Sequence, residues 1–121
     1  MNKQKLEFER RKVLNKIKYS NRCGSKVNLF NAYLSESDEH IMNKFKLWLK
    51  LRRSGYDVLC EPIFENGIRM DILAFKDGVW TNYEILHTET IKQLTEKTKD
   101  YPNITVIPIK NEEDIENLEM I

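Results

Sequence analysis

Two acidic residues lie within successive strand-like segments, Asp71 in Gly67–Phe75 and Glu84 in Val79–His87. Their neighbours are largely apolar, so both carboxylates are expected to be partly buried. A buried carboxylate needs a cation, a hydrogen-bond donor or a metal ion, and Mg²⁺ prefers oxygen ligands of this kind. The pattern predicts a divalent-metal site on two adjacent strands. The alternative is that Asp71 pairs with Arg69 or another base while Glu84 lies at an exposed strand end.

A helix from Ser35 to Ser54 is predicted ahead of these strands. Ser35 is suited to be its N-cap, acidic residues occupy its first turn, and Gly55 follows its end. The expected buried face consists of Ile41, Phe45, Trp48 and Leu49, with Met42 and Leu51 beside them. The expected solvent-facing residues are Lys44, Lys46, Lys50, Arg52 and Arg53.

The remaining pattern predicts an α/β fold in two parts, a basic N-terminal helix or arm with a loop over residues 1–34 and an α/β core over residues 35–121. Asn66-Gly67 and Asp77-Gly78 are typical hairpin turns. The other predicted elements are a helix at Lys3–Tyr19, a loop at Ser20–Leu34, a strand at Tyr56–Pro62, a helix at Thr90–Asp100, a strand buried on both faces at Ile104–Ile109, and a helix at Glu112–Met120 capped by Asn111.

Charge is distributed unevenly along the 121 residues, although the net charge is only +1. Residues 1–56 contain 14 Lys/Arg and 5 Asp/Glu, whereas residues 57–121 contain 6 and 14. A basic half suits a polyanion such as DNA, and an acidic half suits metal ions. The alternatives are that the two halves pair with each other, or that the basic stretch is a solvated helix face or a dimer arm. The expected nucleic-acid-binding residues are Arg10, Arg11, Lys12, Lys16 and Lys18.

Several other classes of protein are disfavoured. Two cysteines, Cys23 and Cys60, are too few for a disulfide framework and are expected to be free thiols. Together with His40 and His87 they could supply four zinc ligands, but no pair has the spacing of a zinc site. No apolar run approaches the ~18 residues of a membrane span, and the basic start lacks the apolar segment of a secretory signal. We therefore expect an intracellular, cytoplasmic protein without a membrane partner.

The order helix, three-stranded meander, helix, strand resembles the core of the PD-(D/E)XK nuclease superfamily, which is restriction-endonuclease-like or Holliday-junction-resolvase-like (α-β-β-β-α-β). The resemblance covers Ser35 to Ile109, and its motifs are GIRMDIL at Gly67–Leu73 and YEIL at Tyr83–Leu86. It implies a nuclease that cleaves phosphodiester bonds in DNA with Mg²⁺ or Mn²⁺, and a homodimer is plausible. The metal ligands that it implies are Asp71, Glu84 and, from the helix, Glu39, with Glu36 the weaker choice.

The sequence departs from the family pattern at Leu86, which stands where the family has a catalytic lysine. Some members of the superfamily carry this lysine on a neighbouring element. Lys92, at the start of the next helix, is the best-placed replacement, and Lys44 and Lys76 are weaker ones. The alternative is a catalytically inactive protein of the nuclease fold that binds nucleic acid or a partner protein.

Overall fold

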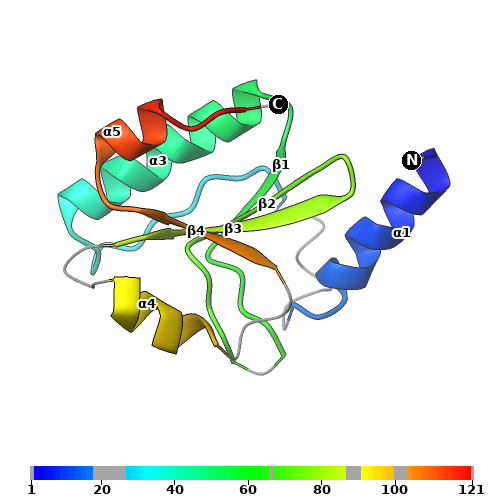
Figure 1. The fold of residues 1–121 in the computed structure, drawn as a ribbon, viewed down its shortest axis with the longest axis horizontal. Coiled ribbons are helices and arrows are strands. Elements are labelled where there is room, and N and C mark those ends of the chain that lie inside the picture. The colour runs from blue at the N-terminus through cyan, green and yellow to red at the C-terminus, as the bar shows by residue number, and fades with distance from the viewer. Residues whose placement is uncertain (1, 18–26, 66, 87–90, 100–103, 121) are drawn as a thin grey trace.

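A four-stranded sheet with helices packed against it forms the body of the protein (Figure 1). The computed structural model describes residues 2–17, 27–65, 67–86, 91–99 and 104–120. The α/β prediction is confirmed at this level. In chain order the elements are α1 (Lys3–Leu14), α3 (Asp38–Arg53), β1 (Asp57–Cys60), β2 (Ile72–Lys76), β3 (Val79–Ile85), α4 (Ile91–Thr98), β4 (Thr105–Ile109) and α5 (Glu112–Glu116).

The strands are ordered β1-β2-β3-β4 across the sheet. The pairs β1–β2 and β2–β3 are antiparallel, and β4 runs parallel to β3. The predicted turn between β2 and β3 is present, because Lys76 pairs with Val79 and the two residues between them, Asp77 and Gly78, have φ of 51° and 82°. Two successive positive φ values match a type I′ hairpin turn. A parallel pair needs a crossover connection, and α4 lies in that connection.

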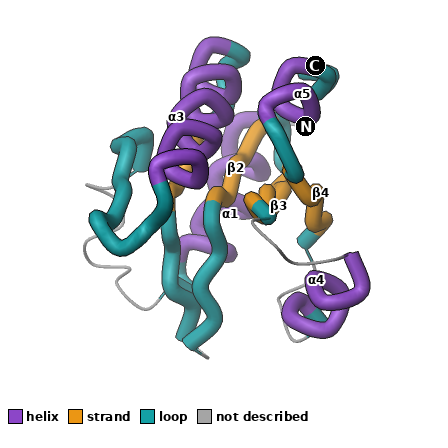
Figure 2. Tube along the Cα trace, turned by 90° about the vertical axis from the view of Figure 1, so that its left-hand side faces the viewer, coloured by secondary structure: helices purple, strands orange, loops and turns teal. Residues whose placement is uncertain are grey.

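The helices cover the two faces of the sheet unequally. α3 and α5 lie on one face, and α4 lies on the opposite side, next to β4 (Figures 1 and 2). The core under α3 and α5 consists of Leu47, Leu51, Val58, Ile72, Ala74, Tyr83, Ile85, Ile109 and Ile115. Full burial of each large aliphatic side chain contributes roughly 1.5–3 kcal/mol, so this layer fixes the position of α3 over the sheet.

A second core lies on the other face and includes the N-terminal helix. Its buried residues are Ile17, Leu59, Phe64, Met70 and Leu73, and Val13 and Leu14 from the end of α1 pack against them. Arg10 Nε lies 3.2 Å from Asp57 Oδ2, and Trp80 Nε1 donates to the Glu9 carbonyl at 3.4 Å. Residues 2–17 therefore pack on the sheet through both apolar and polar contacts.

The register of α3 differs from the prediction. Ser37 is its N-cap, rather than Ser35, and its Oγ accepts from the His40 N–H at 3.1 Å. The buried residues of α3 are Asn43, Lys44, Leu47 and Leu51, so Leu51 is buried as predicted, whereas the predicted solvent position of Lys44 and the predicted burial of Phe45 were wrong. Trp48 is partly buried and packs against the core, and Phe30 packs against the Phe45 and Trp48 rings at centroid distances of 5.0 and 5.9 Å.

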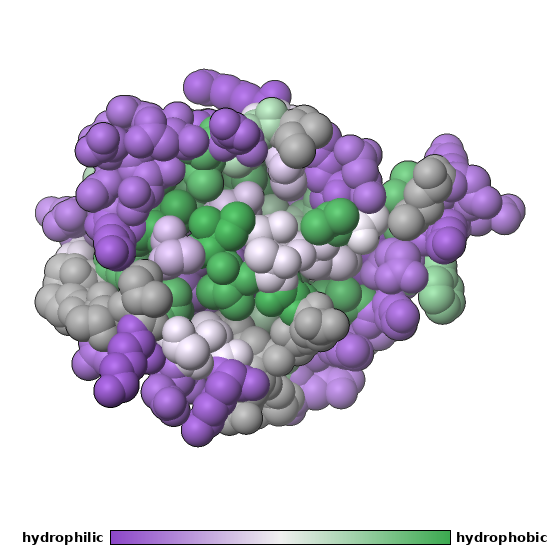
Figure 3. Space-filling model, viewed as in Figure 1, coloured by the Kyte–Doolittle hydropathy of each residue, from purple (hydrophilic) through white to green (hydrophobic). Residues whose placement is uncertain are grey.

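Two strand predictions also need correction. β2 begins at Ile72 rather than Gly67, and the preceding residues form a narrow hairpin in which Phe64 N–H donates to the Ile68 carbonyl at 2.8 Å. β4 is an edge strand, so its middle residues are only half-buried, although α4 and α5 contact it from opposite faces of the sheet. Figure 3 shows apolar side chains across the middle of the face that Figure 1 presents, with polar ones around them. Among the described residues, no helix combines the length and the apolarity that a membrane crossing requires.

Candidate functional site

The start of α3 presents polar side chains at a spacing of four residues. Glu36, His40 and Lys44 follow one another at this spacing, which places them above one another on one side of the helix and its N-terminal extension. Because the helix begins after Ser37, Glu36 lies just outside it. The Glu36 carboxylate accepts from the Tyr33 N–H at 2.8 Å, which holds the side chain at the helix entrance.

Lys44 is completely buried beneath this entrance, with a side-chain exposure of 0%. Its Nζ donates to both carboxylate oxygens of Glu36, at 2.7 and 2.8 Å, and to Glu61 Oε1 at 3.1 Å. Burial lowers the pKa of Lys44, but the hydrogen bond to Glu36 and the charge of Glu61 outweigh it and hold the pKa above the ordinary value for lysine. The ammonium group is therefore charged at neutral pH and is shared by two carboxylates.

The pKa values of Glu36 and Glu61 are shifted in opposite directions, although both carboxylates contact Lys44. Burial raises the pKa of Glu36, but hydrogen bonds from Lys44 and from the Tyr33 N–H outweigh it, and the net pKa is below the ordinary value. Burial raises the pKa of Glu61 as well, and there Lys44 offsets only part of the effect. Glu36 is thus the acid that this environment keeps ionised.

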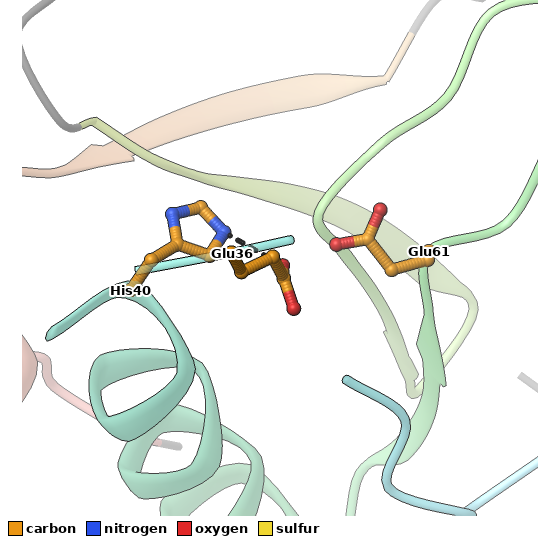
Figure 4. Close-up of side chains that lie close together, drawn as sticks. All are labelled: Glu36, His40 and Glu61. Atoms are coloured by element: carbon orange, nitrogen blue, oxygen red, sulfur yellow. Dashed lines mark ion pairs between the residues drawn. The ribbon is translucent and has the colours of Figure 1, made fainter. Parts of the chain in front are cut away.

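Glu61 reaches the same place from the end of β1. Its backbone has φ of 55°, in the left-handed region, and its N–H donates to the Asp71 carbonyl at 2.9 Å. A non-glycine residue with positive φ is uncommon outside specific turns. This kink ends β1 and turns the Glu61 side chain toward the start of α3, as Figure 4 shows.

His40 connects the two glutamates to Asp71. Its Nε2 lies 3.2 Å from Glu36 Oε1 and 3.9 Å from Asp71 Oδ1. One ligand atom from each of Glu36, His40 and Glu61 lies within 4.8 Å of the other two. Figure 4 shows His40 and Glu36 at the beginning of α3 with Glu61 across from them. We refer to Glu36, His40, Lys44, Glu61 and Asp71 as the α3 cluster.

Asp71 and Glu84, the two acids that the sequence analysis singled out, lie at the same end of the β2–β3 hairpin. The last pair of that ladder is Ile72 with Tyr83, and the next residue on each chain is one of the two acids. Asp71 Oδ2 accepts from the Ile85 N–H at 2.8 Å. The Asp71 carbonyl therefore accepts from the Glu61 N–H at the end of β1, and the Asp71 carboxylate accepts from the end of β3.

Glu84 is almost fully buried, with 1% exposure, next to Asn82 on the same side of β3. Asn82 Nδ2 donates to Glu84 Oε1 at 3.2 Å, whereas the buried Asn82 Oδ1 has no hydrogen-bond partner among the residues that the structure describes. Native proteins rarely leave such an atom unsatisfied. An amide oxygen and a carboxylate are ligands that suit a hard divalent cation, so Asn82 and Glu84 are of the donor types that such an ion prefers.

The other predicted site residues lie elsewhere. Glu39 is exposed on α3, and the acid of this helix region that joins the cluster is Glu36. Lys92 is exposed on α4, across the sheet from α3 (Figure 1). Lys76 donates to the Ser54 carbonyl at 2.7 Å, and Leu86 is buried with 7% exposure. Within the described part of the chain, the lysine that contacts acids of the cluster is Lys44.

The predicted nucleic-acid-binding residues are distributed along and just after α1. Arg10 is half-buried against Asp57, and Arg11 Nε lies 3.3 Å from Glu7 Oε1 on the exposed side of the helix. Lys12 and Lys16 are exposed. Lys18 lies outside the described residues, as do Cys23 and His87. Cys60 is a free cysteine, as expected, and burial raises the pKa of its thiol.

Sequence reasoning missed His40 and Glu61 as members of the site. The spacing of four residues between Glu36, His40 and Lys44 was an available signal, because it aligns side chains on one side of a helix. No comparable signal existed for Glu61, whose orientation depends on the kink after β1.

A cavity of about 250 Å³ lies beside Glu61. Its wall is mostly apolar and aromatic, and its polar members include Asn31, Tyr33 and Glu61. The guanidinium of Arg69 lies 5.6 Å from the centre of the Tyr33 ring. The α3 cluster is therefore adjacent to a space that can accept part of a bound molecule.

No protein-family model matches the chain, and neither does any curated protein or any solved structure. What can be said about function therefore rests on the geometry of the site.

Proposed function

We propose that the protein is a metal-dependent nuclease that hydrolyses phosphodiester bonds in DNA at the α3 cluster and the adjacent Glu84. The observation that carries the proposal is the convergence of Glu36, His40, Glu61 and Asp71 from three separate parts of the chain. Assembling carboxylates in a partly buried position is costly unless cations join them; Lys44 supplies one positive charge to Glu36 and Glu61, and a metal ion would offset the remaining negative charge. Their side chains also remain accessible to small ions, since Glu36 is 14% exposed and Asp71 16%.

The arrangement of the elements supports the nuclease reading of this site. The chain order α3-β1-β2-β3-α4-β4, with an antiparallel meander followed by a parallel strand, is the order that the PD-(D/E)XK resemblance implies. It brings Asp71 and Glu84 to one end of the hairpin and the N-terminus of α3 close to Asp71. This agreement in topology supports a restriction-endonuclease-like core as part of the proposal.

Each residue then has a defined role. Asp71 and Glu84 would hold the metal ion, with Glu36 as the acid from the helix. A divalent ion bound there supplies an activated water and charge stabilisation for the phosphate. Lys44 keeps Glu36 ionised and fixes the directions of Glu36 and Glu61 through its three hydrogen bonds. Because Lys44 is fully buried, we assign it a positioning role and not a contact with the substrate.

The substrate class follows from the surroundings of the site. Exposed basic residues on and after α1 suit the phosphate backbone of a nucleic acid. Phe30 and Tyr33 line the cavity beside Glu61, and aromatic rings of this kind stack on unpaired bases. We therefore expect a nuclease that acts on DNA with unpaired bases, such as ends or branches.

One observation favours a second function, that of an inactive relative that binds nucleic acid. Leu86 leaves the usual lysine position apolar, and Lys44, the lysine of the α3 cluster, already contacts two carboxylates. In that case the metal site would be structural, and the basic residues of α1 would carry the function.

The test is a cleavage assay with labelled single-stranded, duplex and branched DNA in Mg²⁺, Mn²⁺ or chelator. We expect cleavage that requires the metal and is lost in Glu84→Gln, while Glu39→Gln, with its exposed side chain, cleaves like the wild type. Binding of the same DNAs without cleavage under every condition would overturn the nuclease proposal in favour of the inactive relative.

A further inference from the structure

We infer that Glu36, His40 and Glu61 bind a first-row transition-metal ion, such as Mn²⁺ or Zn²⁺, in preference to Mg²⁺. The inference rests on the proposed function because Glu36 belongs to both ligand sets; it adds His40 and Glu61 as ligands and names the class of cofactor. It is carried by the imidazole of His40, a nitrogen donor among oxygen donors.

The imidazole of His40 is turned toward the carboxylates. Nε2 is the atom that faces the carboxylates, at 3.2 Å from Glu36 Oε1 and 3.9 Å from Asp71 Oδ1. His40 lies in the first turn of α3, where its backbone N–H donates to the Ser37 cap, and its imidazole extends from there to the acids. The imidazole is thus presented to the acids by the fold itself, and it retains 17% exposure.

A buried cation, Lys44, contacts Glu36 and Glu61. The Lys44 ammonium lies 2.7 Å from Glu36 Oε1 and 3.1 Å from Glu61 Oε1, which shows that these oxygens converge on positive charge. The carboxylates of Glu36 and Glu61 bind this ammonium, and that of Asp71 lies 3.9 Å from His40 Nε2. Three acids beside one ammonium leave an excess of negative charge that attracts a dication, and the cavity next to Glu61 provides access to the cluster.

The candidate ions differ in the ligands that they prefer. Mg²⁺ demands oxygen ligands and retains most of its water, so an imidazole contributes little to its binding. Imidazole is a good ligand for Zn²⁺ and other transition metals, while carboxylates also suit Mn²⁺. In a site with two glutamates and one histidine, the histidine is therefore the ligand that favours Mn²⁺ and Zn²⁺ over Mg²⁺. Removing the imidazole should remove this preference.

The test measures metal binding to the full chain by calorimetry, with Mn²⁺, Zn²⁺ and Mg²⁺ each used alone. We expect Mn²⁺ and Zn²⁺ to bind at least about tenfold more tightly than Mg²⁺. His40→Gln should weaken Mn²⁺ and Zn²⁺ binding by about tenfold or more and leave Mg²⁺ binding nearly unchanged. Glu39→Gln, one residue away and exposed, is the matched control and should bind all three ions like the wild type.

A spectroscopic measurement separates ligation by His40 from an indirect effect on folding. Pulsed electron paramagnetic resonance of bound Mn²⁺ should show modulation from a directly coordinated nitrogen in the wild type and in Glu39→Gln, and none in His40→Gln. Bound Mn²⁺ without nitrogen modulation in the wild type, or equal affinity for Mg²⁺ and Mn²⁺, would overturn the inference even if the protein cleaves DNA. Nitrogen-ligated Mn²⁺ in a protein that does not cleave would uphold it while the nuclease proposal fails.

Discussion

Lys44 from the middle of α3 and Glu61 from the end of β1 form an ion pair inside the protein, with Nζ and Oε1 3.1 Å apart and the lysine side chain fully buried. The same ammonium also binds Glu36, so it ties the segment before α3 to the end of β1. These two attachments fix the two glutamates of the α3 cluster relative to each other. The buried lysine is therefore the structural centre of the proposed site.

Replacing Lys44 by methionine should destabilise the protein strongly. The substitution leaves Glu36 and Glu61 without their shared cation, and removing one partner of a buried ion pair typically costs about 3–5 kcal/mol. Lys46→Met is the matched control, because Lys46 pairs with Glu112 at the surface and its loss should cost at most about 1 kcal/mol. Urea denaturation measures both. A Lys44→Met protein as stable as Lys46→Met would contradict the assigned role.

Glu36 should stabilise the fold in a pH-dependent way. Burial raises the pKa of Glu36, but its hydrogen bonds outweigh burial and lower the folded-state pKa below 4.5, so its stabilising contribution is present above 4.5 and is lost as the pH falls through the folded value. Glu36→Gln should therefore lower the free energy of unfolding at about pH 7, and the deficit should shrink toward about pH 3. Denaturation at both pH values, with Glu39→Gln beside it, checks this. An equal deficit at both would exclude ionisation of Glu36 as the cause.

Tyr83 should make the protein lose stability at alkaline pH. Burial beneath α3 raises the pKa of Tyr83 from 10.0 to about 12. A raised folded-state pKa means that the contribution is fully present below about pH 10 and is lost as the pH rises toward 12. The free energy of unfolding of the wild type should fall more steeply from pH 10 to 11 than that of Tyr83→Phe, by about 1 kcal/mol. Parallel curves for the two proteins would show that Tyr83 ionises as easily folded as unfolded.

The exposed basic residues of α1 should determine how DNA binding depends on salt. Each phosphate contact contributes about one unit to the slope of log K against log salt for duplex DNA. The double variant Arg11→Ala/Lys12→Ala should reduce the slope by about two units. Lys99→Ala, an exposed position after α4, should leave it unchanged. An unchanged slope in the double variant, with the control also unchanged, would place the DNA contacts elsewhere.

The sequence was sufficient to predict those features that depend on local pattern. Asp77-Gly78 specified the hairpin turn, and the strand pattern around Glu84 predicted a buried carboxylate, which the structure bears out with 1% exposure. Asp71 was predicted inside the second strand, whereas it precedes β2, and it lies at the same end of the hairpin as Glu84.

The α3 cluster could not be predicted in full, because it depends on contacts between distant segments. Lysine is normally a surface residue, and only the pairing with Glu36 and Glu61 explains why Lys44 is buried. The choice between Glu36 and Glu39 depended on which face of α3 packs inward, because Glu36 binds Lys44, a residue that the sequence pattern placed in solvent. Glu61 required knowledge of the backbone kink at its own φ of 55°.

The most direct test of the account is the single-turnover rate of DNA cleavage by Asp71→Asn and Glu39→Gln, compared with the wild type in Mn²⁺. Both substitutions replace a carboxylate by an amide of nearly the same shape, one within the α3 cluster and one exposed on α3. The account predicts that Asp71→Asn loses more than about 100-fold in rate while it stays folded and still binds DNA, and that Glu39→Gln cleaves at the wild-type rate. Equal rates for the two variants, or no cleavage by the wild type, would contradict it.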